Sequence, residues 1–394
     1  EMTSSLVGSE MCIRDRDYPV GLITADEVAM AGGIIGSNNN NYYLYTGQKF
    51  WTGTSYSFDG YDDYAYEFTI GSLGVLNNYY LTSNNGVRPV ISLSSKVKLS
   101  GNGTWNNVFE VEKKGYETIL ANNTVNETTP DFSKVTTASE KGLYKADDDY
   151  TATTGMKSYY FRGAVDNNWV KFGKDRTGKY IYWRIIRING DGSIRMIYTG
   201  TTAPTESTKV VMTGKGTQIT INSRNTFKFN SSENKAEYVG YQYIEGQQHG
   251  YGKCDGTNNA SCTVNGNTVY NSTIKQKIDK WYAGTTLKDN SLVSQDQIFC
   301  NDRSASTSDV TYSNTYYKTL TSWYSTGTQY YYGAYGRLSK SKSPVLTCPT
   351  ASDKFTVNTS NGNGALTYPV GLITADEVAV SYTHLRAHET RRHL

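Results

Sequence analysis

Four cysteines in the middle and later parts of the chain could form either disulfides or a metal site. Cys254 and Cys262 bracket a seven-residue loop rich in Gly, Asn and Ser, while Cys300 and Cys348 enclose a 47-residue segment. Four cysteines allow three pairings, and we favour Cys254–Cys262 with Cys300–Cys348 because the short loop closes readily. A zinc site is the alternative, but no C-x2-C pair is present. Disulfides indicate an oxidising, extracellular compartment.

Residues suited to acid–base or nucleophilic catalysis are few. His249 is the single histidine outside the last 14 residues, and a Ser or Cys nucleophile usually needs such a base beside it. No Gly-x-Ser-x-Gly turn flanks any serine. The acid pair Asp26-Glu27 recurs as Asp376-Glu377, and each pair is typical of the first turn of a short helix. The sequence therefore predicts no catalytic site.

One group of aromatic, acidic and basic residues is the candidate ligand surface. Aromatic faces with carboxylates nearby can stack on sugars, whereas the alternative is that the aromatic residues form the core and sheet surface of a Tyr-rich domain. Three acids of the group, and Asp147–Asp149, also resemble oxygen-rich Ca²⁺ loops, although neither set has EF-hand spacing and solvated acidic turns are favoured. The candidate residues are Trp51, Asp59, Asp62, Asp63, Tyr64, Tyr66 and Arg88.

The composition indicates which scaffold must position these side chains. In 394 residues, 39 Lys and Arg against 36 Asp and Glu leave a formal charge of +3, too small to indicate nucleic-acid binding. The chain holds 34 Tyr and 37 Gly; Tyr and Thr favour strands, while Gly and Asn favour turns. The absence of a run of 18 apolar residues predicts no membrane span. We expect a β-rich α+β fold with short antiparallel sheets and a few helices.

Two segments carry clear local signals. Residues 180–188 and 193–198 are strand-rich runs around the turn Asn189-Gly-Asp-Gly, which predicts a hairpin. Residues 272–282 have an apolar face and a Ser or Thr at their start, which predicts an amphipathic helix. We expect both to anchor the core.

A repeat indicates how the chain is organised. Residues 18–29, Tyr-Pro-Val-Gly-Leu-Ile-Thr-Ala-Asp-Glu-Val-Ala, recur identically as residues 368–379, which chance does not explain. Outside the two copies, residues 1–16 and 381–394 resemble translated sequencing-adapter sequence, and we predict that both are disordered artefacts.

From this repeat we infer a permuted domain. We interpret residues 17–112 as its C-terminal block, 113–140 as a linker and 141–380 as its N-terminal block, so that the second block naturally precedes the first. The two copies of the repeat then compete for one strand position. We predict that only one copy lies in the sheet.

Taken in that order, several motifs resemble a Firmicutes domain family of unknown function found in surface and secreted proteins of gut bacteria. The motifs are residues 183–192 (Trp-Arg-Ile-Ile-Arg-Ile-Asn-Gly-Asp-Gly), 272–275, 281–282, 370–377, 50–51 and 86–90. One departure is that Trp51 leads into Thr-Gly-Thr-Ser, where the family has a small residue and Ser-Pro. The resemblance implies a C-type-lectin-like architecture and no established activity.

These observations together predict a non-enzymatic bacterial module, extracellular or on the cell surface, of adhesive type and used in tandem copies. Its expected partner is a surface ligand, with no cofactor unless a loop holds Ca²⁺. One alternative is a lectin-like module that binds carbohydrate, and a glycan is then the partner. A second, weaker alternative is a glycoside hydrolase with its acids in the loops around residues 59–67, since that reaction needs two carboxylates across a cleft.

Overall fold

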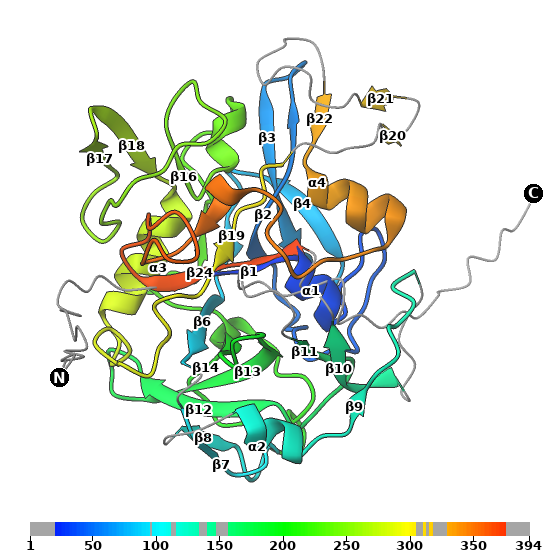
Figure 1. Ribbon diagram of the computed structural model, residues 1–394. Coiled ribbons are helices and arrows are strands. Elements are labelled where there is room, and N and C mark those ends of the chain that lie inside the picture. Colours follow the sequence, from blue (N-terminus) through cyan, green and yellow to red (C-terminus); the bar gives the residue numbers. More distant parts are fainter. Residues whose placement is uncertain are drawn as a thin grey trace, which may run out of the picture.

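The computed structural model describes residues 20–94, 97–111, 116–133, 140–146, 157–304, 310–312, 315–317 and 329–375. Within these residues the chain is β-rich, with several sheets and a few short helices, which confirms the predicted α+β class (Figure 1). The two adapter-like ends, Asp147–Asp149 and Asp376-Glu377 lie outside the described residues.

The largest sheet runs through the middle and lower part of Figure 1. Its strands are, in spatial order, β1 (Val20–Thr24), β24 (Pro369–Thr374), β6 (Pro89–Leu93), β14 (Ile194–Gly200), β13 (Tyr180–Ile188), β11 (Ser158–Arg162), β10 (Gly142–Ala146) and β9 (Val125–Asn126). A branch leaves β13 through β12 (Trp169–Lys174), β8 (Phe109–Val111) and β7 (Leu99–Ser100).

A second sheet and three smaller ones complete the strands that the structure describes. The second sheet consists of β15 (Thr226–Phe227), β5 (Asn85–Gly86), β2 (Phe50–Asp59), β3 (Tyr64–Ile70) and β4 (Leu76–Tyr80), with β22 (Gln329–Tyr331) paired to β2. The smaller sheets join β16 (Gln242–Tyr243), β18 (Asn267–Asn271) and β17 (Ser261–Val264); β19 (Phe299–Cys300) and β23 (Lys354–Phe355); and β20 (Val310–Tyr312) and β21 (Thr315–Tyr317).

The helices are short. They are α1 (Ala25–Ala31), α2 (Tyr116–Ala121), α3 (Thr273–Ala283) and α4 (Gly333–Tyr335), which continues into a π-helical turn, η4 (Gly336–Ser341). Single 3-10 turns are η2 (Lys215–Thr217), η3 (Ala236–Val239) and η5 (Ala351–Asp353).

The predicted hairpin is confirmed and lies at the centre of the large sheet. Strands β13 and β14 pair antiparallel, and β6 and β11 flank them. The turn is closed by the Asn189 N–H, which donates to the carbonyl of Ser193 (2.9 Å), and by Asp191 Oδ1, which accepts from Ser193 N (2.9 Å). Every residue of β14 is buried. The hairpin is therefore enclosed on both faces, as its apolar run indicates.

The predicted helix is confirmed as α3. Ser272 is its N-cap, because its hydroxyl accepts from Lys275 N (3.2 Å). Ile274, Ile278 and Tyr282 are fully buried and share one face at helical spacing. The helix thus fixes one side of the molecule against the sheets.

The repeat is where the structure differs most from expectation. Both copies lie in the large sheet, as β1 and β24, and they pair with each other in parallel with Leu22 opposite Leu372 and Thr24 opposite Thr374. The prediction that only one copy enters the sheet is therefore wrong. The two identical strands pair with each other in register, and each also pairs with β6 at two positions. One copy therefore does not exclude the other from the sheet.

Helix α1 follows the first copy and is held by a buried ion pair. Thr24 and Glu27 form a capping box: Glu27 N donates to Thr24 Oγ1 and Glu27 Oε2 accepts from Thr24 N, both at 3.1 Å. This confirms the predicted helix start for this copy. The same carboxylate also contacts Nε of Arg195 on β14 and lies 4.0 Å from Nε of Arg187 on β13. All three charged side chains are fully buried.

A second buried ion pair joins the small β19–β23 sheet to the loop that carries His249. Asp353 accepts from Nη2 (2.6 Å) and Nε (3.0 Å) of Arg303, and its Oδ1 lies 3.3 Å from Nδ1 of His249. Burial would raise the pKa of Asp353, but Arg303 and His249 outweigh it and lower that pKa to about 2. His249 is thus engaged with a structural carboxylate.

Both favoured disulfides are confirmed. Cys254 pairs with Cys262, with Cα atoms 5.9 Å apart, and Cys300 pairs with Cys348, with Cα atoms 5.6 Å apart. The first closes the loop before β17. The second fastens β19 to a segment 48 residues further along the chain.

The segment predicted as a linker holds regular structure. Helix α2 and strand β9 lie within it, and β9 pairs in parallel with β10. Strands of the two predicted blocks meet in the large sheet, where β6 pairs with β14 and β8 with β12. In the part of the chain that the structure describes, no helix is both long enough and apolar enough to cross a membrane.

Acid should weaken the fold through Asp353. A carboxyl with a folded-state pKa of about 2, against an ordinary 3.8, contributes stability that is present above the ordinary value and lost as the pH falls through the folded one. We expect the free energy of unfolding to fall by about 2 kcal/mol over this range. Denaturant unfolding at several pH values measures it.

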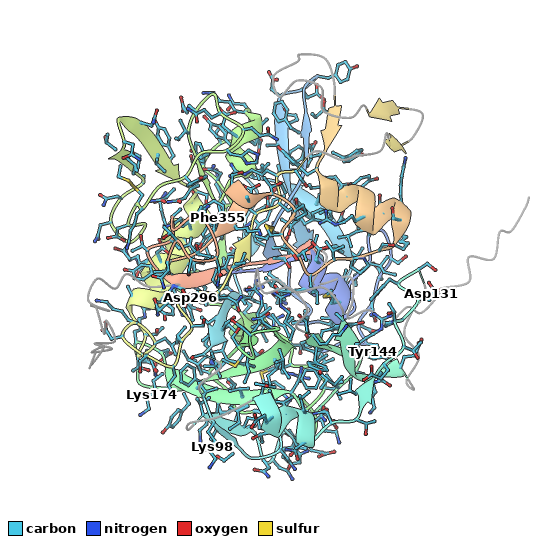
Figure 2. All side chains as sticks on the ribbon, viewed as in Figure 1. Lys98, Asp131, Tyr144, Lys174, Asp296 and Phe355 are labelled. Carbon is cyan, nitrogen blue, oxygen red and sulfur yellow. A yellow bond between two sulfur atoms is a disulfide. The ribbon has the colours of Figure 1, made fainter. Side chains whose placement is uncertain are left out.

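Asp353→Asn should remove this acid dependence and cost about 3–5 kcal/mol at neutral pH, because it leaves Arg303 buried without its counter-ion. Asp296→Asn is the matched control, since Asp296 (labelled in Figure 2) is an exposed acceptor for Asn358 and Ser360. Equal effects of the two substitutions would contradict the assignment.

The two disulfides should differ in what their removal costs. In the chain-entropy model, Cys300→Ser with Cys348→Ser lowers the free energy of unfolding by about 3–4 kcal/mol, and the shorter Cys254–Cys262 loop contributes about 2 kcal/mol. Thermal unfolding of the two double variants measures the difference. A larger loss from the shorter loop would show that the loop-closure argument does not apply.

Candidate functional site

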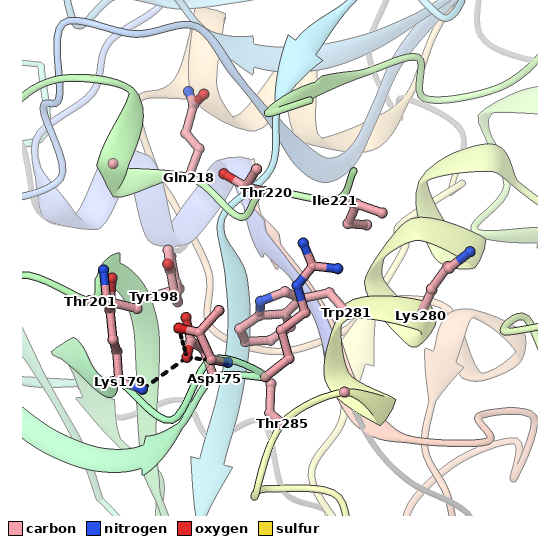
Figure 3. A pocket seen from close by; sticks show the side chains of 14 residues that line it. Asp175, Lys179, Tyr198, Thr201, Gln218, Thr220, Ile221, Lys280, Trp281 and Thr285 are labelled. Atoms are coloured by element: carbon pink, nitrogen blue, oxygen red, sulfur yellow. Dashed lines mark hydrogen bonds between the residues drawn. The ribbon is translucent and has the colours of Figure 1, made fainter. Parts of the chain in front are cut away.

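A cavity of about 420 Å³ lies between the start of β13, the end of β14 and the C-terminal end of α3 (Figure 3). Four segments contribute to it: the turn between β12 and β13, the end of β14 with the residue after it, the stretch from η2 onward, and the end of α3 with its following loop. The lining residues are Asp175, Arg176, Thr177, Lys179, Tyr198, Thr201, Gly216, Gln218, Thr220, Ile221, Lys280, Trp281, Gly284 and Thr285.

The first wall is a tight turn built around one carboxylate. Asp175 Oδ1 accepts from the backbone N–H and the hydroxyl of Thr177 (2.8 and 2.7 Å) and from Lys179 N (3.0 Å) (Figure 3). Such a turn is typical of Asp, whose side chain replaces a backbone acceptor. All three bonds use Oδ1, so Oδ2 is the oxygen that can accept from a ligand.

Aromatic rings form the second wall. Trp281 contacts Tyr198 edge to face, with ring centroids 5.5 Å apart, and Trp183 at 6.4 Å. Trp183 is fully buried and donates its indole N–H to the carbonyl of Phe172 (2.8 Å). Trp281 is only partly buried. A buried ring therefore supports an accessible one.

The remaining walls are fastened to the two main sheets. Ile219 N donates to the carbonyl of Val87 (2.9 Å), and Gln218 Nε2 donates to the carbonyl of Lys49 (2.8 Å). Across the cavity, Thr286 N donates to the carbonyl of Lys174 (3.0 Å), and Lys174 N donates to Thr286 Oγ1 (2.8 Å). These hydrogen bonds fix the position of both walls, and a site whose walls are already fixed costs less to order on binding.

The charge of the lining is positive. Arg176, Lys179 and Lys280 are exposed cations, and Asp175 is the single carboxylate among the lining residues. Burial and the negative charge of Asp175 raise the pKa of Tyr198 above its ordinary value, against a weaker opposing effect of Arg88. The phenol is therefore protonated at neutral pH and can donate a hydrogen bond.

Two predicted ligand residues belong to the core instead. Trp51 is fully buried and donates its indole N–H to the carbonyl of Phe227 (2.5 Å). Arg88 is fully buried, and its guanidinium donates to the carbonyls of Tyr198 (3.1 Å) and Leu44 (2.7 Å). Neither can take part in an exposed surface. Their polar atoms have backbone partners, which is how a core accommodates them.

The other predicted residues gather at the tip of the β2–β3 hairpin. Asp59 ends β2, Asp62 and Asp63 form the turn, and Tyr64 and Tyr66 begin β3. Tyr80 on β4 lies against both tyrosines, at centroid distances of 5.1 and 4.7 Å. Five of the predicted residues thus lie together at this tip, apart from the buried Trp51 and Arg88.

Metal binding finds limited support. The tip holds three acids, Asp59 at the end of β2 and Asp62 and Asp63 in the turn, yet among the described residues no group of three or more His, Cys, Asp or Glu side chains is arranged to hold a metal ion. Asp147–Asp149 lie outside those residues.

Sequence reasoning missed the Trp281 cavity because its parts are far apart in the chain. In the sequence, Trp281 falls on the apolar face of the helix predicted over residues 272–282, and Tyr198 falls in the predicted core hairpin. The sequence holds one signal of the site. Trp281 follows Lys280 in the last turn of its helix, and a tryptophan at that position lies where the helix leaves the core. Nothing in the sequence places Asp175 opposite to it.

Comparison of the chain with protein-family models, with curated proteins and with solved structures finds no match.

The cavity should accept a new side chain at one glycine and not at a neighbouring one. A Cβ at Gly216 meets no atom within 4 Å, whereas a Cβ at Gly200, with φ +129°, would lie 2.7 Å from the carbonyl oxygen of Gly216. We expect Gly216→Leu to change the free energy of unfolding by less than about 1 kcal/mol and Gly200→Leu to lower it by about 2 kcal/mol or more. Thermal unfolding of the two variants measures the difference in stability. Equal destabilisation by both substitutions would contradict the geometry of this wall.

Proposed function

We propose that this chain is a non-enzymatic, extracellular bacterial binding module whose ligand is a saccharide held in the Trp281 cavity. The observation that carries the proposal is the pairing of an accessible indole with hydrogen-bonding groups on the opposite wall. A sugar ring presents an apolar face and a rim of hydroxyls, so its recognition needs both kinds of group within one ring's width.

The lining offers a partner for each part of a sugar. The face of Trp281 is the stacking surface, the protonated phenol of Tyr198 is a donor, and Asp175 Oδ2 is an acceptor. Thr220 adds a hydroxyl from another segment (Figure 3). Arg176 and Lys280 add positive charge at the rim, which favours sugars that carry a carboxylate or a phosphate.

The same lining disfavours hydrolysis. Glycoside hydrolysis generally uses two carboxylates on opposite sides of the scissile bond, and Asp175 is the one carboxylate among the residues around this cavity. His249, the histidine outside the C-terminal tail, contacts Asp353, which Arg303 already engages. These contacts support binding rather than turnover.

Two further observations support the extracellular setting and the lectin-like part of the proposal. The disulfides Cys254–Cys262 and Cys300–Cys348 are typical of oxidising compartments. The motifs at residues 183–192 and 272–282 form the central hairpin and α3, and these two elements support the Trp281 wall. We propose on this basis a C-type-lectin-like module, used in tandem copies on the cell surface.

Binding should depend on the cavity and not on the hairpin tip. A glycan array, run with and without Ca²⁺, identifies the ligand, and titration calorimetry then measures its Kd. We expect Trp281→Ala and Gly216→Leu each to raise the Kd at least about 10-fold, which corresponds to about 1.4 kcal/mol. Gly216→Leu serves as the second variant because Gly216 lines the cavity and a Cβ there meets no atom within 4 Å, so the substitution adds a side chain to the lining without removing a core contact.

Tyr64→Ala is the matched control, since Tyr64 is an exposed aromatic residue of the hairpin tip. It should leave the Kd unchanged. Loss of binding in Tyr64→Ala but not in Trp281→Ala would move the site to the tip, and release of free sugar from the bound glycans would overturn the non-enzymatic proposal.

A further inference from the structure

Positive charge is concentrated in the two segments that meet at the Trp281 cavity. Residues 174–179 hold three cations and one acid, and residues 280–285 hold one cation and no acid. Four cations against one acid leave a charge of +3 on these 12 residues, as much as the formal charge of the whole 394-residue chain. We call the four side chains the rim cations: Lys174, Arg176, Lys179 and Lys280.

The fold brings the two segments into contact around one opening. Hydrogen bonds join Lys174 to the loop after α3, and a Cβ at Gly284 in that loop would lie 3.7 Å from the Cβ of Arg176. Figure 3 shows Lys179 and Lys280 on opposite sides of the cavity. Three of the rim cations line the cavity, and Lys174 directly precedes its first wall.

The rim cations lack the counter-ion that a neighbouring lysine has. Lys171 lies on the same strand, β12, as Lys174, and it pairs with Glu110 (2.5 Å). In the part of the chain that the structure describes, none of the rim cations forms an ion pair with a carboxylate. The acid among them, Asp175, fixes its own turn through Oδ1. Four like charges around one opening therefore favour a bound anion.

The end of α3 does not use these charges either. Cations often lie at a helix C-terminus because the last carbonyls are free to accept hydrogen bonds, and Lys280 lies in the last turn of α3. Here Gly284 N donates to the carbonyl of Trp281 (3.1 Å). Thr285 N donates to the carbonyl of Tyr282 (2.8 Å). These carbonyls thus have partners, and the rim cations stay available to a ligand.

We propose that the saccharide is an acidic oligosaccharide, so that one ring stacks on Trp281 while carboxylate or phosphate groups along the chain lie against the rim cations. This inference rests on the proposed saccharide-binding function and adds the class of saccharide and the side chains that select it. The guanidinium fork of Arg176 can meet a carboxylate or a phosphate with two parallel hydrogen bonds, and the lysines act as point charges. Lys174 is not among the lining residues, so a ligand that uses all four cations extends beyond one ring.

A glycan array with matched acidic and neutral saccharides tests the proposal. Its pairs include oligogalacturonate with its methyl ester, which differ in their carboxylates, and phosphomannan before and after phosphatase treatment, which differ in their phosphates. We expect the acidic member of a bound pair to bind at least about 10-fold more tightly, and the pair that responds distinguishes a carboxylate from a phosphate. Neutral members that bind as tightly as acidic ones would overturn this inference and leave the saccharide proposal intact. An array on which no saccharide binds would overturn the saccharide proposal itself.

Removing two of the rim cations should abolish the preference for charge. In the double variant Arg176→Gln with Lys280→Gln, we expect the Kd of the acidic member to rise at least about 10-fold and that of the neutral member to stay within about 2-fold, because stacking on Trp281 does not depend on charge. Raising NaCl from about 50 to about 500 mM should weaken binding of the acidic member alone, since salt screens exposed charges. Titration calorimetry measures these Kd values. A double variant that keeps the preference would contradict the assignment of these side chains.

The matched control is Lys145→Gln with Lys235→Gln, which removes the same charge at lysines paired with Glu127 (2.5 Å) and Glu245 (3.4 Å). It should leave both Kd values unchanged, and equal effects of the two double variants would show that only the net charge of the protein matters. A DNA oligonucleotide that binds more tightly than the acidic saccharides and displaces them would show that the site selects another class of polyanion, which would also overturn the proposal.

Discussion

The contact between Glu27 and Arg195 is the interaction on which the arrangement of this fold depends. Glu27 closes the capping box of α1, and its carboxylate also contacts the guanidinium of Arg195 on β14. The first copy of the repeat is thereby joined to the central hairpin by one carboxylate that has two structural roles. Both side chains are fully buried, as is Arg187 near the same carboxylate, so the loss of the Glu27 charge would leave two guanidinium groups in the interior without this carboxylate, which is among the costliest changes a core can undergo.

The hairpin carries this charge inside the protein because its guanidinium groups have fixed partners. Arg195 also donates to the carbonyl of Ile298 (3.2 Å), and Arg184 donates from Nη2 to the carbonyl of Val165 (2.7 Å). Arginine suits such positions since its planar fork meets several acceptors at once and it stays charged. With β14 held in this way, Tyr198 near its end has a set position, and the Trp281 cavity forms against it. The proposed binding site is thus a consequence of how the hairpin is anchored.

Local signals predicted local structure well. The turn Asn189-Gly-Asp-Gly and the N-cap Ser272 each lie within the element they define, so the hairpin and α3 could be found from short windows. The disulfide pairing could be predicted because one loop was short.

The Trp281 cavity could not be predicted from the sequence, because Asp175, Tyr198 and Trp281 come together only through tertiary packing. The sequence predicts Trp51 and Arg88 on a surface because side-chain type does not reveal that the backbone carbonyls of Phe227 and Leu44 accept hydrogen bonds from them in the core. The pairing between the identical strands β1 and β24 could not be predicted either, because local sequence patterns do not show which distant strands pair.

In the proposed site the ligand lies on the indole of Trp281. NMR of the ¹⁵N-labelled chain can follow the indole N–H resonances during titration with a saccharide that binds on the glycan array. The Trp281→Phe variant assigns the Trp281 signal. We predict that the Trp281 resonance shifts and saturates, while those of Trp51 and Trp183, which donate to carbonyls in the core, stay in place. A titration that leaves the Trp281 resonance unmoved while the saccharide binds would show that the ligand does not lie on this indole.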